Sequence, residues 1–517
     1  MKKSVPSCIL DAERGRREVC DAGVYEHTSR SRQASDEVMR QNATRYDVVI
    51  GLEIHAQLST KSKMFCRCFA GFGAAPNTNI CPVCTGQAGA LPVLNGKAVE
   101  YALKTALAFN CKINKKSVFS RKNYFYPDLP KGYQISQYDE PLAEKGWAEI
   151  TLKDGSTKKI GITRIHMEED AGKNIHDDKN SYVDLNRSGI PLVEIVSEPD
   201  ITSPEEAVLY FKKLKTVIEY IGTSDCNMEE GNLRCDVNVS LKPAGAKKFG
   251  TKVEIKNLNS FRFVEKALFH EIERQAEALS SGGKIIQETR LFDTDNGVTR
   301  SMRKKEEAND YRYFPEPDIR PLLLDEAFIG SIKSSLPELP DVKTKRFMDS
   351  YKLSFYEADI FCSDKALASY YEETVKLSGD AKLCSSWIQT TVLKALNDNK
   401  IGITEFSIGT KNLSELLALI KEGAINQNTG KDVFDEMLKT GKQAKIIVDE
   451  KGLSQIHDEG LIEKIVDEVI KESTTQVEQY RSGKTAVMGF LVGQVMKKSG
   501  GKAKPAVVNE LLKKKLG

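Results

Sequence analysis

Alternating apolar and polar residues from Tyr46 to Leu58 predict a long strand whose two faces differ in chemistry. One face carries Ile50, Leu52, Ile54, Ala56 and Leu58, and the other carries Glu53, His55 and Gln57. We expect the apolar face to lie in the core, because alternate side chains of a strand point to opposite sides. A carboxylate two residues from an imidazole can reach one cation, and the alternative interpretation is a solvated strand face.

The same alternation returns in four later segments, at 163–170, 183–186, 234–241 and 252–256. The inward positions are Ile165, Met167, Val183, Leu185, Cys235, Val237, Val239, Leu241, Val253 and Ile255. The outward positions are Arg164, His166, Glu168, Asp170, Asp184, Asn186, Arg234, Asp236, Asn238, Ser240, Lys252, Glu254 and Lys256. Asp and Asn are poor strand residues, and departures from local preference cluster at functional sites. We therefore interpret this polar face as a functional surface.

Helices are expected between these strands. The spacing of apolar residues predicts one helix over 98–109, and the Ser203-Pro-Glu-Glu206 capping signal predicts a second one reaching Ile221. A third is expected to follow Asn259 or Ser260 as its cap and to run to Arg274. Strands that pair with one another, with helices inserted between them, predict an α+β domain with an antiparallel sheet.

Beyond Ser335 the pattern changes to successive amphipathic helices, after a linker at 336–340 that contains two prolines. Helices are predicted at 416–422, 432–440, 461–471 and 486–498. We expect a disordered extension at 1–45, a catalytic domain with a zinc knuckle at 46–335, a helical domain at 336–445 and a helical tail at 446–517.

Composition narrows the class of protein. The 517 residues contain 76 Lys and Arg against 73 Asp and Glu, so a nucleic-acid surface must come from local clustering. Such a cluster closes the chain, where Lys497, Lys498, Lys502, Lys504, Lys513, Lys514 and Lys515 can follow a phosphate backbone or simply solvate a terminal helix. No apolar run is long enough to span a membrane, and eleven cysteines, an odd number that forms no dense framework in so long a chain, favour a reducing compartment, the cytoplasm. The acidic residues within 1–45 argue against a targeting peptide.

Four of the cysteines predict a metal site. Cys66-Arg-Cys68 and Cys81-Pro-Val-Cys84 form two short pairs across a loop of a dozen residues. This arrangement fits a tetrahedral Zn²⁺ site with four thiolates, whereas the alternative is four unligated buried thiols. A metal with four protein ligands has no open position for chemistry, so we expect it to be structural.

A segment rich in aromatic residues, 121–134, carries Arg121, Lys122 and Lys131, cations suited to a polyphosphate. Two prolines and a glycine predict that it is a loop, and packed aromatics with solvated lysines are the alternative. The carboxylates of the sheet and the cations of this loop together predict a phosphoryl-transfer site that binds Mg²⁺. A Walker motif is absent, since Glu478 stands where Gly483-Lys484-Thr485 would require the first glycine.

Six motifs carry a resemblance to a known family. The segment Val183-Asp-Leu-Asn-Arg-Ser-Gly-Ile-Pro-Leu-Val-Glu-Ile195 resembles the signature of GatB, the B subunit of the tRNA-dependent aspartyl/glutamyl amidotransferase. The other motifs are Gly51-Leu-Glu-Ile-His55, His166-Met-Glu-Glu-Asp170, Asn227-Met-Glu-Glu-Gly-Asn-Leu-Arg-Cys-Asp236, Lys256-Asn-Leu-Asn-Ser-Phe261 and Asp310-Tyr-Arg-Tyr-Phe-Pro-Glu-Pro317. The resemblance runs from about Tyr46 to the C terminus.

The resemblance implies a cradle-shaped catalytic domain, a helical domain and a tail that touches tRNA. In that family GatB uses ATP and Mg²⁺ to phosphorylate the side-chain carboxylate of Glu or Asp mischarged on tRNA. Ammonia from the amidase partner, GatA, then displaces phosphate, and a small third protein, GatC, clamps the two larger ones together. The substrate that the resemblance implies is Glu-tRNA(Gln), Asp-tRNA(Asn) or both, and the sequence does not decide between these. The alternative is a non-catalytic, zinc-bearing scaffold that binds tRNA.

The resemblance also implies roles for individual residues. The catalytic set is Glu53, His55, Glu168, Glu169, Asp184 and Arg187, of which Glu53, His55 and Glu168 are the expected Mg²⁺ ligands. Residues expected to bind ATP or substrate are Tyr124, Lys131, Asn186, Asp236 and Lys256. Zinc is assigned to Cys66, Cys68, Cys81 and Cys84, and tRNA to Lys497, Lys498, Lys502, Lys504, Lys513 and Lys514. Strand alternation disagrees for Glu169, which would point inward unless the strand ends or bulges there.

Overall fold

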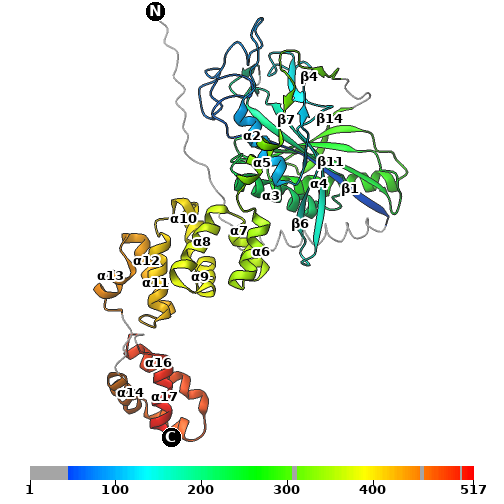
Figure 1. Ribbon diagram of the computed structural model, residues 1–517. Helices are drawn as coiled ribbons and strands as arrows, with labels where there is room; N and C mark the ends of the chain where they lie inside the picture. Colours follow the sequence, from blue (N-terminus) through cyan, green and yellow to red (C-terminus); the bar gives the residue numbers. More distant parts are fainter. Residues whose placement is uncertain (1–44, 178, 305–310, 454–458, 501–502) are drawn as a thin grey trace, which may run out of the picture. The chain divides into compact units, whose positions relative to one another are not determined.

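The computed structural model describes residues 45–177, 179–304, 311–453, 459–500 and 503–517 (Figure 1). The chain divides into two compact units, one ending at Leu336 and the other beginning at Pro337. The extension predicted at 1–45 lies, apart from Arg45, outside the described residues, as does Lys502. None of the helices within the described ranges is long and apolar enough to cross a membrane.

The first unit is built on a nine-stranded sheet with the order β14-β13-β12-β11-β1-β10-β7-β6-β2. Its strands are β1 (Tyr46–Gln57), β2 (Lys112–Ile113), β6 (Ala143–Thr151), β7 (Thr157–Glu169), β10 (Pro191–Ser197), β11 (Leu233–Pro243), β12 (Val253–Leu258), β13 (Glu288–Asp293) and β14 (Val298–Lys304). Neighbouring strands are antiparallel except for the parallel pair β12 and β13. The predicted α+β class is therefore confirmed.

The face of the sheet predicted to be core is buried. Ile50, Ile54 and Ala56 of β1 have no exposed surface, and neither do Val237 and Val239 of β11. Helices α3 (Pro204–Ile221) and α4 (Phe261–Ser280) pack on the sheet through β6, β11 and β12, and they contact each other. Each fully buried Ile or Leu contributes about 1.5–3 kcal/mol, so this face determines which side of each strand is turned inward.

Side chains at the helix starts explain where these helices begin. The Ser203 hydroxyl accepts a hydrogen bond from the Glu206 N–H, and Pro204 occupies the first turn, as predicted. Ser260 caps α4 by accepting from the Phe263 N–H. Two further helices, α2 (Gly96–Ala108) and α5 (Glu326–Ser334), lie against each other in the same unit. Asn95 caps α2 through the N–H groups of Lys97 and Ala98.

Three small sheets complete the first unit, and two of them correct predictions from the sequence. β4 (Phe119–Asn123) pairs with β5 (Tyr133–Gln137) and β15 (Phe314–Pro315), so both ends of the segment expected to be a loop are strands. β9 (Ser181–Asp184) pairs with β8 (Lys173–His176) and not with the main sheet. The strand expected at 183–186 therefore ends early, and its polar residues leave the main sheet face. The third sheet joins β3 (Lys116–Ser117) and β16 (Leu322–Leu323).

The second unit is helical, as expected. Its α-helices are α6 (Pro340–Tyr351), α7 (Phe355–Cys362), α8 (Lys365–Ser378), α9 (Ala381–Trp387), α10 (Leu393–Asn399), α11 (Thr410–Lys421), α12 (Gln427–Thr440), α13 (Ala444–Glu450), α14 (Glu459–Glu472), α15 (Thr474–Arg481), α16 (Met488–Lys498) and α17 (Pro505–Leu516). One core runs from Phe347 to Val448 and a second from Ile462 to Leu516. Because α13 belongs to the first core, that core extends past the boundary expected at 445.

Candidate functional site

Three adjacent strands bring a row of charged side chains together on the polar face of the sheet. The pairing register places His55 of β1 beside Glu194 of β10, and Glu194 beside His166 of β7. Glu194 Oε2 lies 3.2 Å from His55 Nε2 and 3.4 Å from His166 Nε2. The central carboxylate therefore contacts an imidazole on each side.

Glu168 joins His55 and Glu194 in a group of side chains that could hold a metal ion, and this group is called the metal-binding group below. Glu168 Oε1 lies 3.5 Å from His55 Nε2, and the Glu168 side chain is almost fully buried. One ligand atom each from His55, Glu168 and Glu194 lies within 4.8 Å of the other two. Carboxylate oxygens are donors that Mg²⁺ prefers, and this group supplies two carboxylates together with one imidazole nitrogen. These residues fit a divalent cation bound at the sheet face.

The charges in this group support one another. Burial alone would lower the pKa of His55, but the hydrogen bond that His55 donates to Glu194 and the charges of Glu194 and Glu168 outweigh it and raise the pKa. The same balance raises the pKa of His166 to about 9. Burial opposes ionisation of Glu168 and Glu194 as well, yet the neighbouring imidazoles hold both carboxyl pKa values below their usual range. Both carboxylates are therefore ionised, and a cation bound here would replace the proton that His55 Nε2 shares with them.

This group lies in a cleft of about 610 Å³. Basic side chains on its walls include Lys122 of β4, Arg234 of β11 and Lys256 of β12. The charge of Glu168 raises the pKa of Lys122 despite burial, so this side chain is a cation beside the carboxylates. Arg234 Nη2 donates to Asp170 Oδ1 at 2.9 Å. A cleft with both carboxylates and cations suits a metal-bound polyphosphate.

Glu53, Asp236 and Lys256 line the same cleft one step along the sheet. β1 and β11 pair Glu53 with Asp236, and Glu53 Oε1 accepts a hydrogen bond from Asn238 Nδ2 at 2.9 Å. Lys256 forms ion pairs with Asp236 and with Glu254. The structure thus brings the predicted residues Glu53, Asp236 and Lys256 into the cleft, while Glu194 lies with His55 and Glu168 where Glu53 was expected.

Aromatic side chains form another part of the cleft wall. Tyr124, predicted to bind ATP or substrate, packs edge-on against Tyr311, and its hydroxyl donates to Gln134 Oε1 at 3.3 Å. Tyr138 and Tyr313 stack with their ring centroids 4.1 Å apart. Tyr rings of this kind offer flat surfaces for a base or a ribose.

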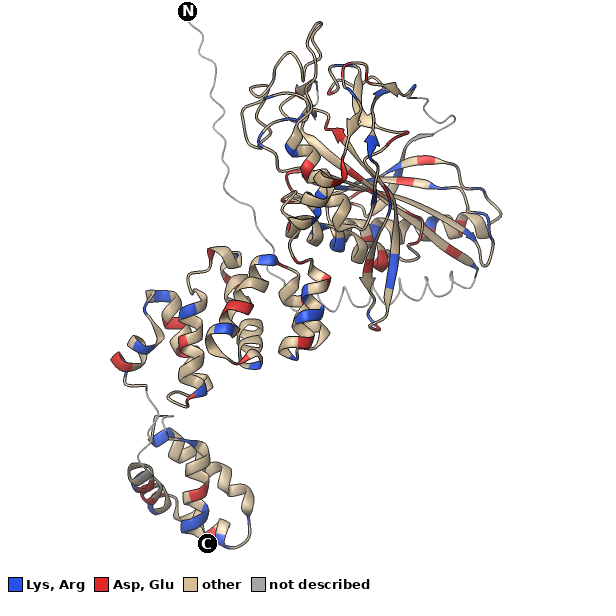
Figure 2. Cartoon of the chain, viewed as in Figure 1, with Lys and Arg blue, Asp and Glu red and all other residues tan. Residues whose placement is uncertain are grey.

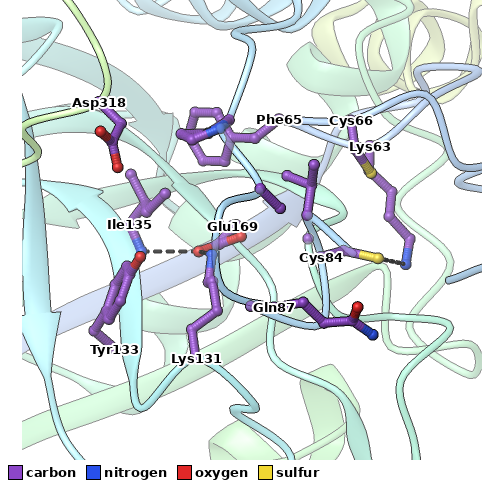
Figure 3. Close-up of a pocket in the computed structure, with 15 residues that line it drawn as sticks. Lys63, Phe65, Cys66, Cys84, Gln87, Lys131, Tyr133, Ile135, Glu169 and Asp318 are labelled. Atoms are coloured by element: carbon purple, nitrogen blue, oxygen red, sulfur yellow. Dashed lines mark hydrogen bonds and ion pairs between the residues drawn. The ribbon is translucent and has the colours of Figure 1, made fainter. Parts of the chain in front are cut away.

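Glu169 and Lys131 lie on the other side of β7, away from the metal-binding group. Their side chains form an ion pair, and Glu169 Oε1 also accepts from the Ile135 N–H at 2.9 Å (Figure 3). Both line a separate cavity of about 60 Å³ together with Cys66 and Cys84. The sheet alternation was therefore right for Glu169, and the position of this carboxylate does not support the catalytic role that the resemblance implied.

Asp184, Asn186 and Arg187 also lie apart from the metal-binding group. Asp184 Oδ1 accepts from the Asn77 N–H at 3.1 Å, and Asn186 Oδ1 accepts from the Asn79 N–H at 2.8 Å. Arg187 donates to the backbone carbonyls of Ala171 and Gly172. These side chains hold loops together: the first two anchor the loop between the cysteine pairs, and Arg187 approaches Asp170, which lines the cleft.

The two cysteine pairs meet as the sequence predicts. The sulfur atoms of Cys66, Cys68, Cys81 and Cys84 lie within 4.8 Å of one another, and Cys81 Sγ and Cys84 Sγ are 3.9 Å apart. Four thiolates around Zn²⁺ at about 2.3 Å would be separated by about 3.8 Å. A hydrogen bond from Cys66 lowers the pKa of Cys84 to about 4, with further contributions from the Cys81 N–H and the charge of Lys63. The geometry and the donor set fit zinc.

Those of the predicted tRNA-binding lysines that the structure describes lie on or next to α16 and α17, where acidic residues accompany them (Figure 2). Lys498 forms ion pairs with Glu468 and Glu472 of α14. Lys515 likewise pairs with Glu463 and Asp467 of α14. Lys498 and Lys515 therefore link α16 and α17 to α14 through ion pairs. We accordingly treat these two lysines as structural and the others considered for tRNA as candidates for binding it.

Glu194 is the functional residue that the sequence analysis missed. It lies at the centre of β10, whose sequence Pro-Leu-Val-Glu-Ile-Val-Ser is otherwise apolar or small and is buried at six of its seven positions. A single carboxylate in such a strand violates the usual preference for an apolar interior, which is itself a signal of function. The strand alternation used elsewhere could not find it, because β10 does not alternate.

The protein combines a sheet domain that gathers carboxylates and cations in one cleft, a four-cysteine cluster and a helical unit, an arrangement that suits an enzyme acting on a charged substrate. A family model described as the GatB/GatE catalytic domain matches residues 48–330, and one described as a GatB domain matches residues 369–516. The chain belongs to the GatB family.

Individual relatives agree with this assignment. The chain is 57% identical to the B subunit of the aspartyl/glutamyl-tRNA(Asn/Gln) amidotransferase of Thermodesulfovibrio yellowstonii, over 90% of this chain and 98% of the relative. It is 54% identical to the protein of the same name from Syntrophotalea carbinolica, over 92% and 99%. For Persephonella marina the identity is 55%, over 91% and 99%.

Proposed function

We propose that this chain is the component of a tRNA-dependent amidotransferase that activates and amidates the side chain of Glu or Asp mischarged on tRNA, in the cytoplasm. The relatives named above are the B subunits of aspartyl/glutamyl-tRNA(Asn/Gln) amidotransferases and align over almost their whole length. The observation that carries the proposal is the close approach of His55, Glu168 and Glu194 inside a cleft that also holds Lys122.

The first chemical step is phosphoryl transfer. A carboxylate oxygen of the substrate side chain attacks the γ-phosphorus of ATP, and ADP leaves as an acyl phosphate forms. Mg²⁺, when bound, neutralises and orients the phosphate oxygens. Glu168, Glu194 and His55 would hold this ion, while Lys122 balances charge on the transferring group. Tyr124 would pack against the bound nucleotide or aminoacyl end, and Asp236 and Lys256 would hold the other end of the cleft.

The second step is amidation. Ammonia attacks the acyl carbon, phosphate leaves, and the nitrogen loses a proton to give the amide. An acyl phosphate hydrolyses readily, so the intermediate must be sheltered from water. The almost complete burial of Glu168 and Glu194 supports this step, because groups held beside these carboxylates would have little contact with solvent. Ammonia would come from the amidase partner, GatA, with the small protein GatC as the third member of a heterotrimer.

A non-catalytic tRNA scaffold is the less favoured function. It would explain the four-cysteine cluster and the tail lysines, but it needs no cleft that gathers ionised carboxylates around an imidazole.

The proposed tRNA surface comprises Lys497, Lys504, Lys513 and Lys514, which lie on or beside α16 and α17. Zinc at the cysteine cluster would have a structural role in either function.

The deciding experiment measures ATP hydrolysis and amide formation by the assembled heterotrimer. We expect both activities to require Mg²⁺ and mischarged tRNA, supplied separately as Glu-tRNA(Gln) and Asp-tRNA(Asn). The separate reactions identify the substrate. A complex that binds mischarged tRNA tightly and consumes no ATP would establish the scaffold instead.

A further inference from the structure

Lys63 is a completely buried lysine beside the cysteine cluster. Its exposed fraction is 0%, and its ammonium lies 3.3 Å from the Leu185 carbonyl oxygen. The same ammonium lies 3.6 Å from Cys84 Sγ (Figure 3). No carboxylate oxygen of the described residues lies within 4.0 Å of this ammonium. A buried cation without a counter-charge is costly, so the negative charge that accompanies Lys63 must come from the thiolates.

The cysteine cluster in turn requires a positive charge nearby. Four thiolates carry four negative charges and Zn²⁺ carries two positive ones, so the loaded site keeps an excess of negative charge. Hydrogen bonds and charges just outside the ligands tune how firmly such a site holds its metal. Cys84 receives hydrogen bonds from the Cys81 N–H at 3.2 Å and from Lys63. The ammonium of Lys63 can therefore balance part of the excess negative charge of the zinc-loaded cluster.

The second contact of Lys63 reaches the segment that leads into the metal-binding strand. Leu185 lies between β9 and β10, and β10 carries Glu194. The Leu185 N–H donates to Asn77 Oδ1 at 2.8 Å, and Ser188 Oγ donates to the Cys84 carbonyl at 3.3 Å. Residues 185–188 are therefore held against the cysteine loop by three contacts, with Lys63, Asn77 and Cys84.

Gly189 allows this close packing. The Met64 N–H donates to its carbonyl at 2.7 Å, and its own N–H donates to the Asp170 carbonyl at 2.8 Å. Its φ of 86° lies in the left-handed region that favours glycine. A Cβ at this position would make ordinary van der Waals contact at 3.5 Å with both Lys63 Cδ and Cys84 Cβ, so the backbone conformation and not the space favours glycine. The backbone here connects the cysteine cluster on one side with the end of β7 on the other.

We propose that Lys63 is a positioning residue that supplies the counter-charge of the cysteine cluster and links the cluster to the 185–189 segment before β10. The proposal rests on zinc at the four cysteines. It gives the zinc a second consequence beyond local stability, because loss of the metal would release the contact between Lys63 and Leu185. The entry into the strand that carries Glu194 would then lose one of its supports.

The test uses the assembled heterotrimer with Lys63→Met, which keeps an unbranched side chain one atom shorter than that of lysine and removes its charge. Lys104→Met is the matched control, since Lys104 is a partly buried lysine of α2 that pairs with Glu100. Zinc release to a chelator is followed optically, and zinc content is measured by mass spectrometry. We expect release from Lys63→Met to be about 10–100-fold faster than from wild type, and release from Lys104→Met to be unchanged.

A second measurement does not depend on the folding of a variant. Hydrogen exchange of wild-type amides at 185–189 is compared before and after zinc is removed. We expect exchange there to rise on zinc removal and to rise similarly in zinc-loaded Lys63→Met. Equal zinc release from Lys63→Met and wild type, or unchanged exchange at 185–189 in zinc-free wild type, would overturn the proposal. Wild-type protein that holds no zinc at all would instead refute the zinc assignment.

Discussion

Glu168 and Glu169 are neighbours in the sequence, yet their carboxylates point to opposite sides of β7. Glu168 reaches His55 on the polar face, at 3.5 Å, while Glu169 pairs with Lys131 on the face toward the cysteine cluster. The alternation of a regular strand produces this separation, because β7 continues without a bulge through both residues. One acid is thus available to a metal ion, and the other holds a buried lysine.

The first prediction follows from this separation. Glu168→Gln should lower Mg²⁺-dependent ATP consumption by the heterotrimer at least about 100-fold, because an amide binds the cation weakly and lacks the negative charge. Turnover with mischarged tRNA is the measurement. Glu205→Gln, on the exposed side of α3, is the control and should behave as wild type. Normal turnover by Glu168→Gln would exclude the metal role.

A second prediction separates Glu194 from Glu53. Glu194 belongs to the group of ligand atoms, whereas Glu53 accepts a hydrogen bond from Asn238 elsewhere in the cleft. Glu194→Gln should therefore raise the Mg²⁺ concentration required for half-maximal activity about 10-fold or more, and Glu53→Gln should raise it less. Titration of both variants with Mg²⁺ gives the ranking, and the reverse order would restore Glu53 as the ligand.

A third prediction concerns the cysteine cluster. Cys81→Ser should lower the thermal unfolding temperature by several degrees, because a structural zinc site contributes directly to folding. Activity per folded molecule should fall less than stability does. Calorimetry and active-site titration of the same preparation test this, with Cys111→Ser as a control for a buried cysteine outside the cluster. A larger loss of activity than of stability would point to a catalytic metal.

A fourth prediction divides the lysines of the tail into two groups. Lys513→Ala and Lys514→Ala should weaken tRNA binding and reduce its salt dependence by about one unit of slope for each phosphate that is no longer neutralised. Lys498→Ala should mainly destabilise the tail, since Lys498 pairs with Glu468 and Glu472. Binding measured at several salt concentrations, together with thermal unfolding, distinguishes these outcomes. Equal loss of affinity in all three variants would contradict the division.

A fifth prediction concerns acid stability of the helical unit. Hydrogen bonds from Arg346 lower the carboxyl pKa of Glu338, and the same arginine opposes burial to lower that of Glu372. A lowered pKa in the folded state gives stability that is present above the ordinary value near 4.5 and is lost as pH falls through the lowered value. Unfolding followed from pH 7 to pH 3 should show this loss, and Glu372→Gln should reduce it. An unaltered pH profile for that variant would exclude the contribution.

Local patterns determined much of the fold. Alternation identified the buried faces of β1, β7, β11 and β12, because strand geometry and apolar burial act on each segment separately. Capping groups likewise located the start of α3, and the paired cysteines predicted their own meeting. Such features depend on residues close in the chain, so they can be recognised without knowledge of the tertiary structure.

The composition of the candidate site depended on the tertiary structure. Alternation assigns a face to each side chain, but it does not say which strands are neighbours or in what register they pair. The position of β10 between β1 and β7 placed Glu194 between His55 and His166, while pairing of β9 with β8 removed Asp184 from the sheet. The chain by itself determined which residues face the cleft from each regular strand. Backbone hydrogen bonds between distant segments decided which of them meet, because register is a property of paired strands and not of either strand alone.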